Sequence, residues 1–244
     1  MTHRNSYLQR YHLIFGIAVL VLAWLMMSGP VMAQTHICRF GETPPVSLSF
    51  VNKDPQLDRS RSVRWLNQRS NRNSRWIVSG LTEYELRAAF DMKIEPVAAG
   101  NGLYCLWPAR VLPRVEVVKH LVYVASELVR GTCEYDVVYA HEAQHVAINQ
   151  RIEDEINKAM QGLVETITQD FAAMTALPAS MVQNRSQQLL TRYGRDFQNL
   201  ITQVDRARTR DHAAIDTSAE YGRIASQCGP DSAFTTTLQD AMRR

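Results

Sequence analysis

Two histidines four residues apart, with a glutamate directly after the first, stand in the stretch CEYDVVYAHEAQHVAINQ at residues 133–150. On a helix, His141 and His145 project from the same face, one turn apart. Two imidazole nitrogens held at this spacing can bind a zinc ion. Glu142 lies about 100° further round such a helix, where its carboxylate can deprotonate a metal-activated water without binding the metal itself. The spacing therefore predicts a zinc (Zn2+) centre at His141 and His145, with Glu142 as the general base of a hydrolysis.

An ordinary helix interface is the competing interpretation, because buried histidines can also be hydrogen-bonded core residues. The residues around the motif are uncharged, as expected for a helix buried beneath a sheet: Val138, Tyr139, Ala140, Ala143, Gln144, Val146 and Ala147. Two of the 7 histidines stand here at ligand spacing. We therefore favour the metal site over the core interpretation.

The first 33 residues have the features of a secretory signal peptide. Arg4 and Arg10 precede an apolar run from Leu13 to Met27, and VMA ends at Ala33, where signal peptidase requires small side chains. An uncleaved anchor is the alternative, but the run is shorter than the about 20 residues that a membrane span needs. Cleavage removes two arginines and no acid, so the formal net charge falls from +3 to +1. We expect an exported protein, periplasmic or extracellular, that binds neither nucleic acid nor, after cleavage, a membrane.

The cysteine count predicts disulfides. All four cysteines follow the predicted leader, and an even number in an exported chain points to two disulfide bonds. Three pairings are possible, and the sequence does not choose between them: the residues are Cys38, Cys105, Cys133 and Cys228.

The HExxH pattern resembles that of the zincin metallopeptidases, and of exported bacterial zinc-protease-like families with a helix pair after the motif. The resemblance covers the motif helix and, loosely, the strand-rich segment before it. It implies that His141 and His145 bind zinc, that Glu142 is the catalytic base, and that a peptide substrate aligns by edge pairing with the preceding strand, Val115–Ala125. The chain departs from the metzincins, since VAINQR after His145 contains neither their glycine nor their third histidine.

The resemblance also implies a third ligand, because a zincin without that histidine usually takes a carboxylate from a later helix. If the third and fourth cysteines pair and close the open end of a helix hairpin, His141 falls opposite Glu220 and His145 opposite Asp216. Glu220 is our first choice as the third zinc ligand. Asp216 and His212 are the alternatives, because helical phase places them nearer the apolar stripe. A helix that restarts at Asp216 would instead make this residue a structural N-cap.

Two parts of the mature chain differ in pattern. Residues 34–130 carry β-branched and aromatic runs broken by Gly, Pro and Asn, which predicts an antiparallel strand-rich part. Its last run, RVEVVKHLVYVA, is apolar on both faces and predicts a covered strand. From Tyr135 onward, apolar residues recur at three- and four-residue steps, interrupted at TALPASMVQN, which predicts a long antiparallel helix hairpin over residues 131–228. We therefore predict an α+β fold in one zincin-like domain, residues 34–244, with residues 229–244 as a tail.

The predicted function is that of an exported zinc-dependent, peptidase-like hydrolase. Its substrate would be a peptide or protein. A further possibility is zinc-dependent hydrolysis of something other than protein, such as a cell-wall peptide cross-link. Tyr221 or His212 could donate a hydrogen bond to the oxyanion of the transition state. The alternative function is non-catalytic: a cell-envelope protein whose helix hairpin binds a partner, with zinc structural or absent.

Overall fold

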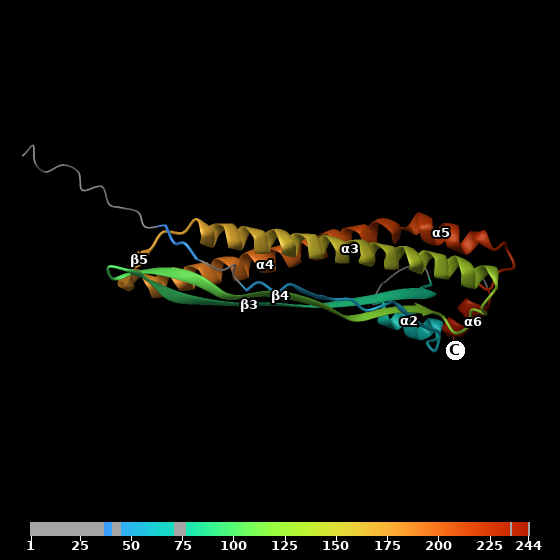
Figure 1. Ribbon diagram of the computed structural model, residues 1–244. Helices are drawn as coiled ribbons and strands as arrows, with labels where there is room; N and C mark the ends of the chain where they lie inside the picture. The colour runs from blue at the N-terminus through green and yellow to red at the C-terminus, as the bar shows by residue number, and fades with distance from the viewer. Residues whose placement is uncertain (1–36, 41–44, 71–76, 235, 244) are drawn as a thin grey trace, which may run out of the picture. The chain divides into compact units, whose positions relative to one another are not determined.

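Two long strands form the centre of the fold. The computed structural model describes residues 37–40, 45–70, 77–234 and 236–243, and the predicted signal peptide at residues 1–33 lies outside them. Within the described residues, β3 (Gly80–Gly100) and β4 (Leu103–Val124) pair antiparallel along nearly their whole length (Figure 1). Asn101 and the glycines on either side of it join them with positive φ angles. Glycine and asparagine adopt this backbone conformation more readily than other residues do.

Three short strands extend this pair into a five-stranded sheet. β1 (Ser49–Val51) and β2 (Gln56–Asp58) each pair with β4 in parallel. β5 (Leu177–Pro178) pairs with the start of β4 in antiparallel orientation. The sheet is therefore mixed, and β4 has neighbours on both sides.

The prediction of an antiparallel strand-rich part is wrong. β1 joins β4 at Arg114–Glu116 and β2 joins it at Leu121–Tyr123, both in parallel, while β3 pairs along the other edge of the same segment. Three-residue strands are too short to show a period-two pattern, so the sequence carried no signal for them. Val115–Ala125 consequently runs inside the sheet, where it cannot align a substrate by edge pairing.

Helices cover the sheet on one side (Figure 1). α3 (Cys133–Ala172) begins at the N-cap Thr132, whose side chain accepts a hydrogen bond from the backbone N–H of Tyr135. Acidic residues in its first turn, Glu134 and Asp136, also favour a helix start here. α4 (Ala179–Ile215) follows β5 and packs against α3. Apolar side chains of both helices form a core with the strands around Val115, Ile156 and Phe197 and around Leu106, Phe171 and Tyr193.

The predicted helix hairpin over residues 131–228 is also wrong. β5 interrupts the connection between the helices by joining the sheet, and α4 ends at Ile215. A separate helix, α5 (Ser218–Gln227), then starts at the N-cap Thr217, whose hydroxyl accepts from the N–H of Glu220. The segment therefore contains three helices and a strand, and the break between α4 and α5 falls at Asp216.

Two short helices pack together near one end of the sheet (Figure 1). α2 (Val63–Arg69) has Ser62 as its N-cap, and α6 (Thr237–Arg243) lies in the segment predicted as a tail. Val63, Leu66 and Leu238 are fully buried and belong to one apolar cluster with the end of β4.

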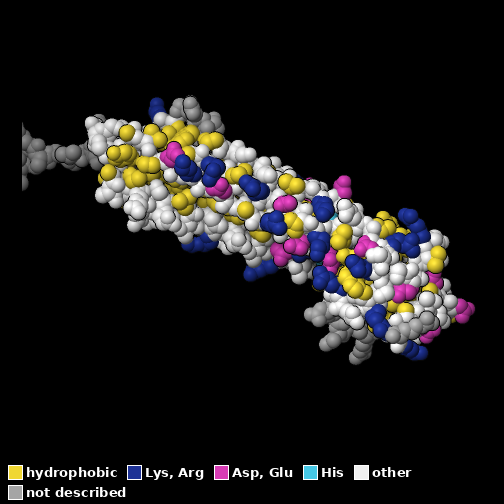
Figure 2. Space-filling view, turned by 90° about the horizontal axis from the view of Figure 1, so that it is seen from below, with side chains coloured by type: hydrophobic (Ala, Val, Ile, Leu, Met, Phe, Trp, Pro, Cys, Tyr) yellow, Lys and Arg dark blue, Asp and Glu magenta, His cyan; other side chains and the backbone are white. Residues whose placement is uncertain are grey.

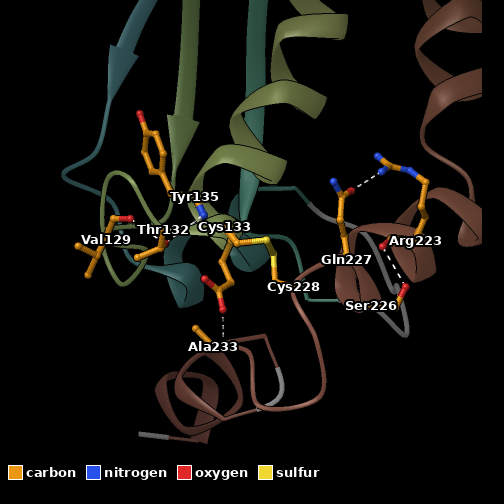
Figure 3. Close-up of a disulfide and its surroundings, with 10 residues drawn as sticks. Val129, Thr132, Cys133, Tyr135, Arg223, Ser226, Gln227, Cys228 and Ala233 are labelled. Atoms are coloured by element: carbon orange, nitrogen blue, oxygen red, sulfur yellow. Dashed lines mark hydrogen bonds between the residues drawn. A yellow bond between two sulfur atoms is a disulfide. The ribbon is translucent and has the colours of Figure 1, made fainter.

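Two disulfides connect distant parts of the chain, Cys38–Cys105 and Cys133–Cys228. This is the pairing that the search for a third ligand assumed. The second bond joins the first residue of α3 to the residue after α5 (Figure 3). Next to it, the backbone N–H of Ala233 donates a 2.9 Å hydrogen bond to Glu134 Oε1. The bond therefore ties α5 and the segment after it to the start of α3.

Charged side chains of both signs are mixed on one face of the molecule (Figure 2). On the strand pair, Arg87 and Glu116 face each other across the ladder, and Arg110 donates a 2.9 Å hydrogen bond to Asp91. Such exposed cross-strand pairs contribute only about 0.2–1 kcal/mol each, so they set register more than stability. Among the described residues, no helix has the length and apolar character that a membrane span requires.

Candidate metal centre

The motif residues lie near the start of α3 and are almost fully buried. His141 and Glu142 are each 3% exposed, and His145 is 6% exposed. Asp216 lies at the break between α4 and α5, next to the motif residues of α3. Its side chain is only 8% exposed. Because Thr217 caps the next helix, Asp216 stands between two helices, outside the phase of either.

Three donor atoms form a nearly equilateral triangle. Nε2 of His141 and Nε2 of His145 lie 3.3 Å apart, and Asp216 Oδ1 lies 3.3 Å from the first and 3.2 Å from the second. Two ligands of a tetrahedral ion with bonds of about 2.0–2.1 Å lie roughly 3.3–3.4 Å apart. The spacing of all three atoms fits one small tetrahedral cation. His141, His145 and Asp216 can therefore hold a metal ion.

Glu220, our first choice for the third ligand, lies on the opposite side of His141. Its Oε1 is 3.6 Å from Nδ1 of His141, the ring nitrogen that does not face the triangle. Its carboxylate accepts hydrogen bonds of 2.6 and 2.8 Å from Arg223, and this interaction lowers the pKa of Glu220. The alternative, Asp216, is the carboxylate that the structure brings to both Nε2 atoms. At 3.6 Å, Glu220 makes no hydrogen bond to Nδ1 of His141, and its charge acts on the side of the ring away from the triangle.

Glu142 lies beside the triangle and is fixed by the first residues of β3. Thr82 Oγ1 donates a 2.7 Å hydrogen bond to Glu142 Oε2. Gly80 passes so close that a Cβ atom there would lie 2.4 Å from Glu142 Oε1. Burial raises the pKa of Glu142, against the opposing effects of His145 and the Thr82 hydrogen bond.

The charge balance around His141 favours a cation. Burial by itself lowers the pKa of His141, but the hydrogen bond to Asp216 and the charge of Glu142 outweigh it, so the net shift is upward. A proton on Nε2 of His141 occupies the space between this nitrogen and Asp216 that a metal ion would take. A positive charge between His141 and Asp216, whether a proton or a metal ion, therefore stabilises this pair.

His212 and Tyr221 take different positions at the site. Nδ1 of His212 lies 2.6 Å from Nδ1 of His145, on the side of that ring away from the triangle. Burial, then the charge of His145, lowers the pKa of His212 to about 4. Tyr221 donates a 3.1 Å hydrogen bond to Asp216 Oδ1. Of the two, Tyr221 is the one that reaches the triangle.

Two cavities meet at Glu142, Gly80 and Tyr221. The larger, about 540 Å³, also touches His141 and has an apolar wall made by Ile77, Val138, Ile224, Phe234, Leu238 and Met242. The smaller, about 320 Å³, is more polar and is lined by Thr82, Arg208, Thr209 and His212. The site therefore opens toward an apolar space on one side and a polar space on the other.

Several residues of the site carry no signal in the sequence. Gly80 and Thr82 are ordinary residues at the start of a strand, and only their contact with Glu142 marks them. His120 on β4 and Asn149 on α3 are fully buried polar side chains behind His145. Of these residues, only Asn149 could have been indicated, because its four-residue step from His145 puts the two on one helix face.

No protein-family model, no curated protein and no solved structure matches the chain. The structure defines an α+β protein that has a buried two-histidine, one-aspartate group able to hold a metal ion.

Proposed function

We propose that the protein is an exported, zinc-dependent hydrolase of peptide bonds, similar to the zincins. The observation that carries the proposal is the triangle of His141 Nε2, His145 Nε2 and Asp216 Oδ1, with edges of 3.2–3.3 Å and a buried glutamate beside it. Two histidines and one carboxylate are a donor set of catalytic zinc sites, which keep a fourth position open.

Zinc at this position supplies a Lewis acid that polarises a carbonyl and lowers the pKa of a water toward about 7. Glu142 accepts the proton of the attacking water at Oε1 and later returns it to the leaving amine. Thr82 holds the other carboxylate oxygen by its 2.7 Å hydrogen bond, which leaves Oε1 to accept that proton. Tyr221 lines both cavities, and its single hydroxyl proton, donated to Asp216 Oδ1 in the structure, would turn to the developing oxyanion to stabilise it.

Iron is the main competitor for this donor set, because two histidines and a carboxylate also bind iron in oxygenases. The buried Glu142 favours hydrolysis, since a base beside the metal position has a role in water activation. A structural zinc site is less consistent with the donor set. Such sites use four protein ligands, and the described residues bring three together.

Export is supported by the two disulfides, which form and persist in oxidising compartments. The signal-peptide pattern at residues 1–33 points the same way.

The apolar cavity beside Glu142 supports a substrate with a large apolar side chain next to the cleaved bond. Ala225 of α5 lines this cavity, so Ala225→Leu should narrow it. We expect this variant to shift cleavage toward smaller side chains. The matched control is Ala219→Leu, because Ala219 is exposed on the same helix. If both variants cleave a peptide library with the parent pattern, the cavity does not select the side chain.

The decisive experiment combines metal analysis with one substitution. Mature protein with intact disulfides is stripped with a chelator, supplied in parallel with zinc, iron or manganese, and incubated with casein and with purified cell wall. We expect zinc to bind stoichiometrically and to restore hydrolysis. Glu142→Gln should keep its zinc and lose about 10²–10⁴-fold in rate. A variant that cleaves as fast as the parent removes Glu142 as the base, and hydrolysis by neither form favours the non-catalytic envelope protein.

A further inference from the structure

A row of buried polar side chains leads from the metal centre into the core. His145 Nδ1 lies 2.6 Å from His212 Nδ1, and His212 Nε2 lies 2.9 Å from Asn149 Oδ1. Asn149 Nδ2 is 3.5 Å from His120 Nε2, and His120 Nδ1 is 3.3 Å from the backbone carbonyl oxygen of Lys53. Asn149 and His120 are 0% and 1% exposed. The row connects α3, α4, β4 and the segment between β1 and β2.

The last member of this row decides the direction of every hydrogen bond in it. A carbonyl oxygen only accepts, so His120 must carry its proton on Nδ1, which leaves Nε2 as an acceptor. Asn149 then donates to His120 through Nδ2 and accepts from His212 at Oδ1. His212 therefore has its proton on Nε2 and accepts at Nδ1. The reverse direction would place two acceptors against each other at Lys53.

We infer that this chain of hydrogen bonds fixes the tautomer of His145. Because His212 Nδ1 is an acceptor, His145 must donate from Nδ1, and its Nε2 is the nitrogen that faces His141 and Asp216. Rotating the ring or moving the proton would break the chain. His212, Asn149 and His120 are therefore positioning residues for a metal ligand. This inference rests on the proposed metal site but does not depend on which reaction occurs there.

The chain has two effects on cation binding. It directs a lone pair of His145 toward Asp216 Oδ1 at 3.2 Å, an arrangement that is favourable only with a cation between them. It also supplies the partner of the second ring nitrogen, which commonly changes metal affinity by about 10–100-fold when removed. The effect should reach Asn149, whose side chain hydrogen-bonds to His212 and His120 rather than to the donor atoms of the triangle.

The first test reads the tautomers directly. Zinc-loaded full-chain protein with ¹⁵N-labelled histidine is examined by long-range ¹H–¹⁵N correlation, which distinguishes protonated from unprotonated ring nitrogens. We expect protons on Nδ1 of His145, Nε2 of His212 and Nδ1 of His120. A proton on Nε2 of His120 or on Nδ1 of His212 overturns the inference, whether or not the protein hydrolyses any substrate.

The second test measures zinc affinity by competition with a chromophoric chelator. Asn149→Leu should raise the Kd for zinc by about 10–100-fold. His212→Phe should do the same, and His212→Asn, which keeps an acceptor near the position of Nδ1, should recover part of the loss. Tyr193→Phe is the control, because it removes a buried hydroxyl bonded to Asp170, far along α3 and α4. Equal affinities in Asn149→Leu and the parent, or no zinc binding by the parent, would overturn the inference.

Discussion

Thr82 Oγ1 donates a 2.7 Å hydrogen bond to Glu142 Oε2, so a strand residue orients the carboxylate that follows the first histidine of the motif. The contact joins β3 to α3 across 60 residues of sequence. In the proposed hydrolysis, the other carboxylate oxygen, Oε1, is the proton acceptor. The orientation of the proposed base thus depends on the sheet as well as on its own helix.

Removing this hydroxyl should reduce turnover without removing the metal. A hydrogen bond to a charged group contributes about 1.5–3 kcal/mol, so we expect Thr82→Val to lower kcat by at least about tenfold. Zinc content, measured by atomic absorption, should stay at the parent level. Thr82→Ser keeps the hydroxyl and should retain most activity. If Thr82→Val turns over like the parent, the hydrogen bond has no role in orienting Glu142.

Gly80 should not tolerate a side chain. A Cβ atom there would lie 2.4 Å from Glu142 Oε1 and 2.7 Å from Val138 Cγ1, so Gly80→Ala must push the carboxylate away. We expect loss of hydrolysis and a decrease of about 1–3 kcal/mol in the free energy of unfolding. Denaturant titration and a rate assay measure the two effects.

Gly162→Ala is the matched control for this substitution. Gly162 lies inside α3, where an added Cβ meets nothing within 4 Å. Alanine is the better helix former, so this variant should be slightly more stable and fully active. Normal activity in Gly80→Ala would show that the carboxylate relaxes without cost.

The two acidic residues after α4 should differ in their effect on metal binding. Asp216→Ala removes a vertex of the triangle and should raise the Kd for zinc at least about 100-fold, because a donor at 3.2–3.3 Å from both imidazoles is lost. Glu220→Gln keeps the shape of a residue 3.6 Å from His141 Nδ1 and should raise it by about tenfold or less. Isothermal titration with zinc compares them. A larger loss in Glu220→Gln than in Asp216→Ala would make Glu220 the ligand.

The two disulfides should both stabilise the fold, but only one should affect the metal centre. Cys133–Cys228 encloses His141, His145 and Asp216 and holds α5 to α3. Replacing this pair by serine should cost about 2–5 kcal/mol and weaken zinc binding. Replacing Cys38 and Cys105, which join near β5 and the start of β4, should lower Tm while the zinc Kd stays unchanged. Equal zinc affinities in the two double variants would show that the metal centre does not depend on the Cys133–Cys228 disulfide.

The sequence predicted the part of the site that is local. His141, Glu142 and His145 share one helix turn, so their spacing alone brings them together. Asp216 was only an alternative, because counting positions across an assumed hairpin placed Glu220 opposite His141, and that count does not hold beyond the end of α4 at Ile215. Thr82 reaches the site through strand pairing over a long sequence distance, which no single-sequence pattern encodes.

The fold followed the same division between local and non-local information. The apolar residues on both faces of RVEVVKHLVYVA indicated a covered strand, and β4 is buried there between its neighbours. β1 and β2 are three residues long, and their parallel pairing with β4 depends on tertiary contacts rather than on their own amino-acid composition. The sequence pattern therefore gave no signal for β1 or β2, and the prediction of an antiparallel part left them out.

The sequence separation of 71 between His145 and Asp216 sets the order in which the proposed metal centre can assemble. A nascent or partly unfolded chain has only the histidine pair of one helix turn, which chelates weakly. Tight binding at the proposed metal site therefore requires α4 to pack along α3, so that Asp216 at the end of α4 lies next to His141 and His145. In the proposed metal-bound protein, release of the ion during gradual denaturation would therefore report the undocking of α4 from α3.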